Sequence, residues 1–167
     1  MNDPKKKIKL TNPWHLLAVG FGSGFAPLVP GTMGTAFAIF PYLLLAHLPF
    51  WVYVAVCLFS FWIGIHICQK TSDDMGVHDH GSIVWDEFVG LWITMLIIPF
   101  YGINPLDLKW LAAGFVLFRF FDMVKPWPIG WLDKRVHGGL GIMIDDVVAG
   151  IMAGIGLVCV GGLLNWL

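Results

Sequence analysis

Residues 50–68, FWVYVAVCLFSFWIGIHIC, contain no Asp, Glu, Lys or Arg and are apolar almost throughout. A stretch of this length and composition is typical of a helix that crosses the hydrocarbon core of a membrane, which takes about 20 apolar residues. The whole chain has the same character, because 57% of its 167 residues are hydrophobic and 13% are charged. A soluble domain carries about 25% charged residues. We therefore predict an all-α membrane protein, and the composition excludes a disordered chain.

Further apolar runs lie on both sides of this one, at residues 33–48, 83–101, 106–124 and 147–167. Together the runs predict a polytopic membrane helical bundle of about five spans, although the first is short and two others include ionisable residues. Residues 14–29 are also apolar but are interrupted by glycines and by Pro27. This pattern favours a short N-terminal interfacial or re-entrant segment. We expect residues 1–167 to form a single domain.

The basic residues indicate which side of the membrane each connection faces. One predicted face gathers Lys5, Lys6, Lys7, Lys9, Lys70, Lys125, Lys134 and Arg135. Because Lys and Arg concentrate in cytoplasmic loops, this face is expected to be cytoplasmic together with the N-terminus, and Lys109 lies on the opposite side. The net charge of −1 provides no basic field for nucleic acid. The expected partner is the lipid bilayer, and no protein partner is required.

Adjacent acids stand in apolar sequence at two places on the same face, Asp86-Glu87 and Asp145-Asp146. The simpler explanation is the helix dipole, which stabilises a carboxylate near a helix start by about 0.3–1 kcal/mol. Two neighbouring carboxylates at partly desolvated depth repel each other, however, and a bound divalent cation would relieve that repulsion. Oxygen ligands alone predict Mg²⁺. Zinc at His78 and His80 is the weaker hypothesis, because residues at i and i+2 do not share a helix face.

Small residues follow each acidic pair at helical spacing. The two series are Asp86, Gly90, Thr94 and Asp146, Gly150, Gly154. Such stripes let helix backbones approach closely in membranes. We therefore expect the third and fifth spans to pack together and to bring both acidic pairs into one coordination sphere.

The fourth run ends with Arg119, Asp122 and Lys125, which are three apart and lie along one helix face. An arginine inside a span costs about 2.5–3.5 kcal/mol at mid-helix, and less near an end, so it needs compensation. One explanation is an internal ion pair with Asp122 while Lys125 extends to the headgroups. The other is a phosphate-binding site, with Arg119 as a bidentate fork and Lys125 as a point charge. The residues alone leave both open.

Two glycine-rich segments accompany these charged groups. PGTMG at residues 30–34 precedes the first span, where backbone N–H groups can bind an anion or Thr32 can simply cap the helix. It is not a nucleotide-binding motif. HGGLG at residues 137–141 is expected to be a flexible loop, which either closes over a substrate or is simply a linker.

Four motifs, in their order and chemistry, resemble those of bacterial phosphatidylglycerophosphatase A. They are PGTMG (30–34), IVWDEFVG (83–90), FRFFDMVKPWP (118–128) and GGLGIMIDD (138–146). The resemblance covers nearly the whole chain, from Asn12 to the last span. It implies a multi-pass enzyme of the bacterial inner membrane that uses Mg²⁺ to remove the terminal phosphate of phosphatidylglycerophosphate, which leaves phosphatidylglycerol.

Resemblance and chemistry together suggest a role for each group. The expected metal ligands are Asp86, Glu87, Asp145 and Asp146. Arg119 and Lys125 are expected to clamp the phosphate, and Asp122 to orient a ligand or to act as base toward the attacking water. Expected substrate contacts are Gly31, Thr32 and Asp79.

The competing function is a non-enzymatic membrane carrier or assembly protein that uses an intramembrane network of Arg119 and the acids. A proton relay needs ionisable residues at every depth, whereas the outer halves of the predicted spans contain only His47 apart from Asp107 and Lys109 at the outer end of the fourth run. A CDP-alcohol phosphotransferase is a second enzymatic hypothesis, but its D-x2-D-G-x2-A-R signature is absent from the sequence. The sequence therefore favours the phosphatase.

Overall fold

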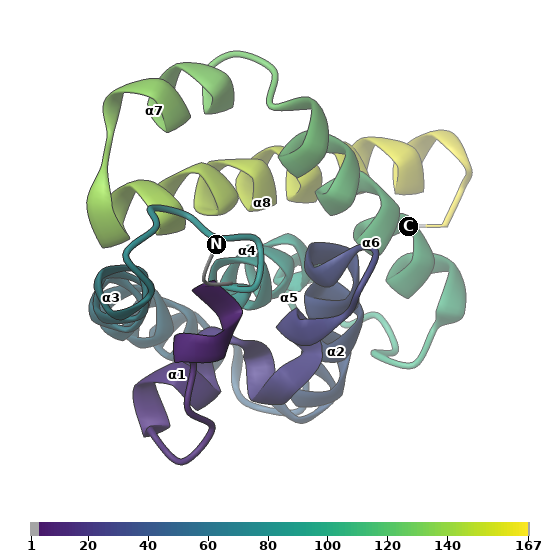
Figure 1. The fold of residues 1–167 in the computed structure, drawn as a ribbon. Helices are drawn as coiled ribbons and strands as arrows, with labels where there is room; N and C mark the ends of the chain where they lie inside the picture. The colour runs from purple at the N-terminus through teal and green to yellow at the C-terminus, as the bar shows by residue number, and fades with distance from the viewer. Residues whose placement is uncertain (1–3, 167) are drawn as a thin grey trace.

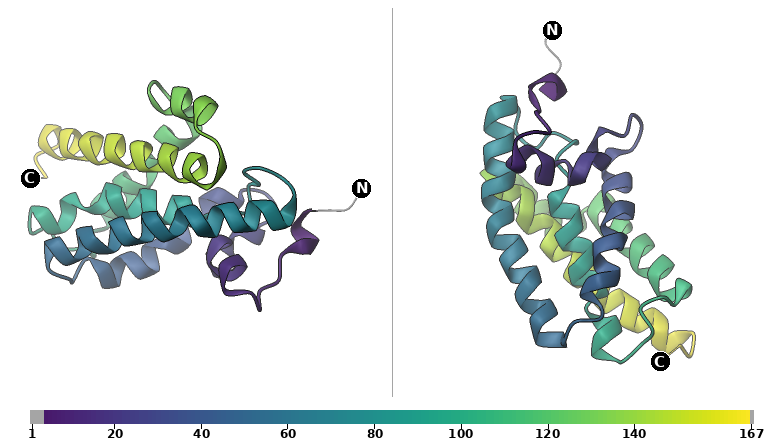
Figure 2. Two further views of the ribbon diagram at one scale, coloured as in Figure 1. Left: turned by 90° about the vertical axis from the view of Figure 1, so that its left-hand side faces the viewer. Right: turned by 90° about the horizontal axis from the view of Figure 1, so that it is seen from below.

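The computed structural model describes residues 4–166, which form helices and connections and contain no strand. Three short helices come first, η1 (Pro4–Lys7), α1 (Pro13–Ala18) and η2 (Gly20–Phe25). The remaining helices are α2 (Pro30–Leu45), α3 (Phe50–Met75), α4 (Trp85–Met95), α5 (Ile97–Phe100), α6 (Leu108–Val124), α7 (Ile129–Arg135) and α8 (Gly138–Leu163). The bundle is elongated, with η1 at one end and the end of α8 at the other (Figure 2).

Helix α4 forms the centre of the bundle. All of its residues except Ile93 are buried, and α2, α3, α6 and α8 pack around it (Figure 1). It begins where the Val84 N–H donates to the Ala18 carbonyl oxygen at 2.8 Å. Asp86 and Glu87 lie in its first turn, where the positive end of the helix dipole stabilises a carboxylate. The first acidic pair is therefore held at the bundle's central axis.

Close packing of α4 on α8 confirms the contact predicted from the two stripes of small residues. A Cβ on Gly150 would overlap the Gly90 carbonyl oxygen, and a Cβ on Gly90 would lie 2.9 Å from the Asp146 carbonyl oxygen. The Thr94 hydroxyl lies 3.2 Å from the Gly150 carbonyl oxygen. The two backbones thus touch along these stripes, and the two acidic pairs are brought to the same end of the bundle.

Helix α8 starts earlier than the sequence pattern predicts. The expected flexible loop at residues 137–141 is instead its first turn, and the helix runs from Gly138. The glycines serve close packing, because a Cβ on Gly139 would overlap the Ile65 carbonyl oxygen of α3. The loop prediction is wrong for this reason. It follows that Asp145 lies two turns inside the helix, where the dipole at its start does not account for a carboxylate.

The predicted count of about five spans is not confirmed. Among residues 4–166, two helices are long and apolar enough to cross a membrane, α3 and α8. Helix α2 has 16 residues and α6 has 17. The run at 83–101 is divided, because α4 ends after 11 residues at Met95 and α5, which contains Pro99, follows. Proline lacks the N–H that would continue the helical hydrogen bonding across this break.

The segment before α2 has the irregular backbone expected of it. Phe21 and Gly22 adopt left-handed conformations, with φ of 56° and 103°. Gly24 packs so closely on the next connection that a Cβ there would overlap the Ser82 carbonyl oxygen. The segment's irregular backbone is therefore supported by protein contacts.

Candidate active site

A pocket of about 300 Å³ lies at the end of the bundle where α4 begins and α6 ends. The charged side chains that line it are Asp79, Asp86, Glu87, Arg119, Asp122, Lys125, Asp145 and Asp146. All four predicted metal ligands are thus gathered around one pocket with the predicted phosphate clamp. Of the three expected substrate contacts, Asp79 is in this lining, whereas Gly31 and Thr32 are not.

Lys125 connects α6 to both α7 and α8. Its Nζ donates to Asp145 Oδ2 at 2.6 Å and to Asp133 Oδ1 at 2.7 Å. Burial lowers the pKa of this ammonium, but the hydrogen bonds to the two carboxylates outweigh the burial and raise the pKa above its ordinary value. Lys125 is therefore a fixed positive charge on the pocket wall. Asp133, its second partner, was not among the residues that the sequence singled out.

Arg119 contacts three partners through one nitrogen. Its Nη1 lies 2.6 Å from Asp122 Oδ2, 3.3 Å from Glu87 Oε1 and 3.3 Å from Thr35 Oγ1. The internal pair with Asp122 that the sequence allowed is therefore present, but Arg119 also connects α6 to α4 and α2. Its buried Nε has no hydrogen-bond partner. Arg119 is part of the pocket wall, where its guanidinium can bind an anion.

Three buried acids keep oxygen atoms without hydrogen-bond partners, namely Asp86 Oδ1, Asp145 Oδ1 and Asp146 Oδ2. Leaving a buried carboxylate oxygen unpaired costs free energy, so such atoms mark a place for a ligand. A set of carboxylate oxygens has the chemistry that Mg²⁺ prefers. The donor set therefore fits this cation.

The spacing of the acids is looser than the sequence analysis expects. Within residues 4–166, no three or more His, Cys, Asp or Glu side chains are grouped closely enough to hold a metal ion. The two acidic pairs thus share a pocket but not one preformed coordination sphere. Basic groups account for this spacing, because Lys125 binds Asp145 and Arg119 binds Glu87.

The start of α2 supports the site from behind. Helix α2 begins at Pro30 after Val29 without a side-chain cap, so Thr32 is not the helix cap. A Cβ on Gly31 would overlap Glu87 Oε1. Thr35, which the sequence analysis missed, is fully buried and donates to Glu87 Oε2 at 2.8 Å. The i, i+4 spacing of Gly31 and Thr35 is the sequence signal that places both on the helix face toward Glu87.

The histidines of the zinc hypothesis hold the loop that covers this end of the bundle. His78 Nε2 accepts from the Gly138 N–H at 2.9 Å, and His80 Nδ1 accepts from the Ser82 N–H at 3.1 Å. Between them, Asp79 has a left-handed backbone with φ of 46°. Both histidine rings are thus engaged by backbone N–H groups, and the structure adds no support to the zinc hypothesis.

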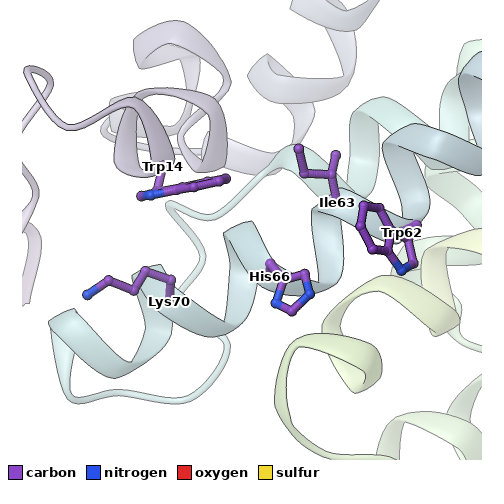
Figure 3. A pocket seen from close by; sticks show the side chains of 5 residues that line it. All are labelled: Trp14, Trp62, Ile63, His66 and Lys70. Carbon is purple, nitrogen blue, oxygen red and sulfur yellow. The ribbon is translucent and has the colours of Figure 1, made fainter.

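A second pocket of about 370 Å³ lies between α1 and α3 (Figure 3). Trp14 of α1 faces Trp62, His66 and Lys70 of α3 across it. The Lys70 Nζ is paired with Asp74 at 2.7 Å. The lining of this pocket contains no carboxylate, so the pocket lacks the oxygen ligands that Mg²⁺ prefers.

Comparison with known proteins assigns the chain to a family whose motifs surround the acidic pocket. The family model of phosphatidylglycerophosphatase A matches residues 16–161. The chain belongs to the phosphatidylglycerophosphatase A family. The resemblance drawn from the motifs is thereby confirmed. No solved structure matches the chain.

Two curated relatives carry the same name. The chain is 56% identical over 149 residues to the phosphatidylglycerophosphatase A of Escherichia coli (strain K12), which covers 89% of this chain and 84% of the relative. It is 52% identical over 153 residues to the phosphatidylglycerophosphatase A of Haemophilus influenzae, with 91% of each chain covered. Three of the four motifs of the phosphatidylglycerophosphatase A resemblance supply residues to the pocket lining, and PGTMG supplies Gly31 behind it.

Proposed function

We propose that this protein hydrolyses the terminal phosphate of phosphatidylglycerophosphate and releases phosphatidylglycerol and inorganic phosphate. The substrate is inferred from membership of the phosphatidylglycerophosphatase A family. The observation that carries the proposal is the composition of the pocket, where Arg119 and Lys125 lie beside buried carboxylates with unpaired oxygens. Such a site can bind a phosphomonoester and stabilise charge that develops on it.

We further propose that the reaction depends on Mg²⁺ and that three of the four predicted acids hold it. Asp86, Asp145 and Asp146 offer the unpaired oxygens, while Glu87 is the fourth acid of the predicted set. When bound, the metal would neutralise the phosphate and offset negative charge in the transition state. The acids would have to move closer together than in this structure, which the release of Asp145 from Lys125 would allow.

The chain's own residues provide the remaining chemistry. Arg119 provides one positive charge for the phosphate, and Lys125 provides a second. Asp122 holds Arg119 at 2.6 Å and is the base that we propose for the attacking water. Hydrolysis breaks the bond between phosphorus and the glycerol oxygen, and water supplies the new oxygen of the released phosphate.

We propose a multi-pass protein of the inner membrane with its pocket on the cytoplasmic side. Two long apolar helices support membrane insertion. The Lys7 Nζ donates to the Met75 carbonyl oxygen at 2.9 Å, which holds the lysine-rich N-terminal segment at the pocket end of the bundle. Positive charge at that end favours the cytoplasmic side. The lipid headgroup then enters the pocket while its tails stay in the bilayer.

The test is the release of inorganic phosphate from phosphatidylglycerophosphate by the purified protein in detergent. We expect release with Mg²⁺, loss of release with excess EDTA, and recovery when Mg²⁺ is restored. Asp73→Asn, a change at an exposed acid that accepts from Gln69, should leave the activity intact. An absence of release in the presence of Mg²⁺ would overturn the proposal.

A further inference from the structure

Thr35, in the second turn of α2, places a buried hydroxyl between two charged residues of the pocket. Its Oγ1 lies 2.8 Å from Glu87 Oε2, 3.0 Å from the Gly31 carbonyl oxygen and 3.3 Å from Arg119 Nη1. A hydroxyl has one proton, and the carboxylate is both the closer and the charged acceptor. The hydroxyl therefore donates to Glu87 and accepts from Arg119.

The face of α2 around Thr35 fits the Glu87 side chain closely. A Cβ on Gly31 would overlap Glu87 Oε1, and a Cβ on Gly34 would lie 3.1 Å from Glu87 Oε2. Positions 31, 34 and 35 share one helix face. Two glycines thus let the carboxylate approach the helix, and the Thr35 hydroxyl binds it there.

Glu87 connects this helix face to Arg119. Its Oε1 lies 3.3 Å from Arg119 Nη1, and its Oε2 is bound by Thr35. Both oxygens of Glu87 are therefore engaged, in contrast to Asp86, Asp145 and Asp146 with their unpaired oxygens. On the arginine, Nη1 is held from three sides and Nε has no partner.

We propose that Thr35 is a positioning residue, whose hydroxyl holds Glu87 so that Glu87 fixes the Arg119 guanidinium for the substrate phosphate. The inference rests on the proposed phosphatase function. Glu87 then acts through Arg119, and the remaining three acids are the ones that offer oxygens to a cation.

Two matched comparisons isolate the hydroxyl. Thr35→Val keeps the shape of the side chain without the O–H, and Thr35→Ser and Thr35→Ala differ from each other by the O–H alone. In phosphate release from phosphatidylglycerophosphate with saturating Mg²⁺, we expect kcat to fall about 10-fold or more for Val and Ala, with KM changed less than about 3-fold. Thr35→Ser should retain wild-type kcat within about 3-fold. Thermal unfolding and gel filtration in detergent identify the folded variants.

A second measurement tests whether Thr35 acts through Glu87. Adding Thr35→Val to Glu87→Gln should cause little further loss of kcat, because the connection to Arg119 is already broken. The inference is overturned if Ser and Ala have equal kcat, if the two losses are fully additive, or if both hydroxyl-free variants fail to fold while Ser folds. Wild-type protein that releases no phosphate would instead refute the proposed function, and the inference with it.

Discussion

Lys125 Nζ lies 2.6 Å from Asp145 Oδ2 and joins the end of α6 to the interior of α8. This contact pairs a residue of the proposed phosphate clamp with one of the proposed metal ligands. The ammonium and the carboxylate neutralise each other at a partly buried position, so removing one of them leaves an uncompensated charge. This ion pair is therefore satisfied before substrate arrives, whereas the pocket lining as a whole has six acids and two basic residues. Binding of a phosphate together with a cation would give Lys125 and Asp145 each a new partner of opposite charge.

Lys125→Met should abolish most of the activity. Methionine keeps most of the length of the side chain but removes the charge that faces the phosphate, and loss of one such electrostatic contact costs about 10²–10³ in kcat. Lys134→Met is the matched control, because this exposed lysine of α7 is outside the pocket lining. The measurement is phosphate release at saturating Mg²⁺. Equal rates for the two variants would exclude Lys125 from the clamp.

Asp86→Asn should lower the apparent affinity of the enzyme for Mg²⁺ as well as its rate. An amide is a poorer ligand than a carboxylate, so the Mg²⁺ concentration for half-maximal activity should rise at least about 10-fold. Asp107→Asn is a suitable control, since Asp107 caps α6 through the Lys109 N–H and asparagine caps equally well. An unchanged Mg²⁺ titration for Asp86→Asn would remove Asp86 from the metal site.

Gly150→Ala should destabilise the fold. The new Cβ would overlap the Gly90 carbonyl oxygen, so α4 and α8 would have to separate at a cost of about 1–3 kcal/mol. Gly162→Ala, near the end of the same helix, has open space around the new methyl group. Alanine there is expected to stabilise the helix by about 0.5–1 kcal/mol. In detergent, the midpoint temperature of thermal unfolding should fall for Gly150→Ala and rise for Gly162→Ala. A Gly150→Ala protein as stable as the wild type would contradict the close contact.

Cysteine labelling tests the proposed orientation. In a Cys159→Ser background, which removes the exposed native cysteine, Lys109→Cys should react with a membrane-impermeant maleimide in cells whose outer membrane alone is permeabilised. Lys134→Cys should react only after the inner membrane is opened. The reverse pattern would place the pocket on the periplasmic side.

The contact between α4 and α8 could be predicted from the sequence because it depends on a repeated pattern. Asp86, Gly90 and Thr94, like Asp146, Gly150 and Gly154, repeat every four residues, and helical geometry places such residues on one face. The same contact brings the acidic pairs to one pocket. Charged residues in apolar sequence are costly, so their positions also marked the site.

The structure differs from the prediction where glycines can indicate either a loop or a closely packed helix. At residues 137–141 glycines suggested a loop, yet Gly139 lies inside a helix because α3 packs against its backbone. A glycine-rich loop and a glycine-rich helix can be distinguished only by the helix that packs against them, and the local sequence does not specify that helix. Thr35 was missed for a related reason, since its partners Glu87 and Arg119 are 52 and 84 residues away along the chain.

The central claim is that the acidic pocket hydrolyses a lipid phosphomonoester. It is tested most directly by measuring phosphatidylglycerol and inorganic phosphate together, from phosphatidylglycerophosphate in mixed micelles, for the wild type and for folded Asp146→Asn. We predict equal amounts of both products from the wild type and almost none from the variant. A wild type that forms neither product, or an Asp146→Asn protein as active as the wild type, would contradict the claim.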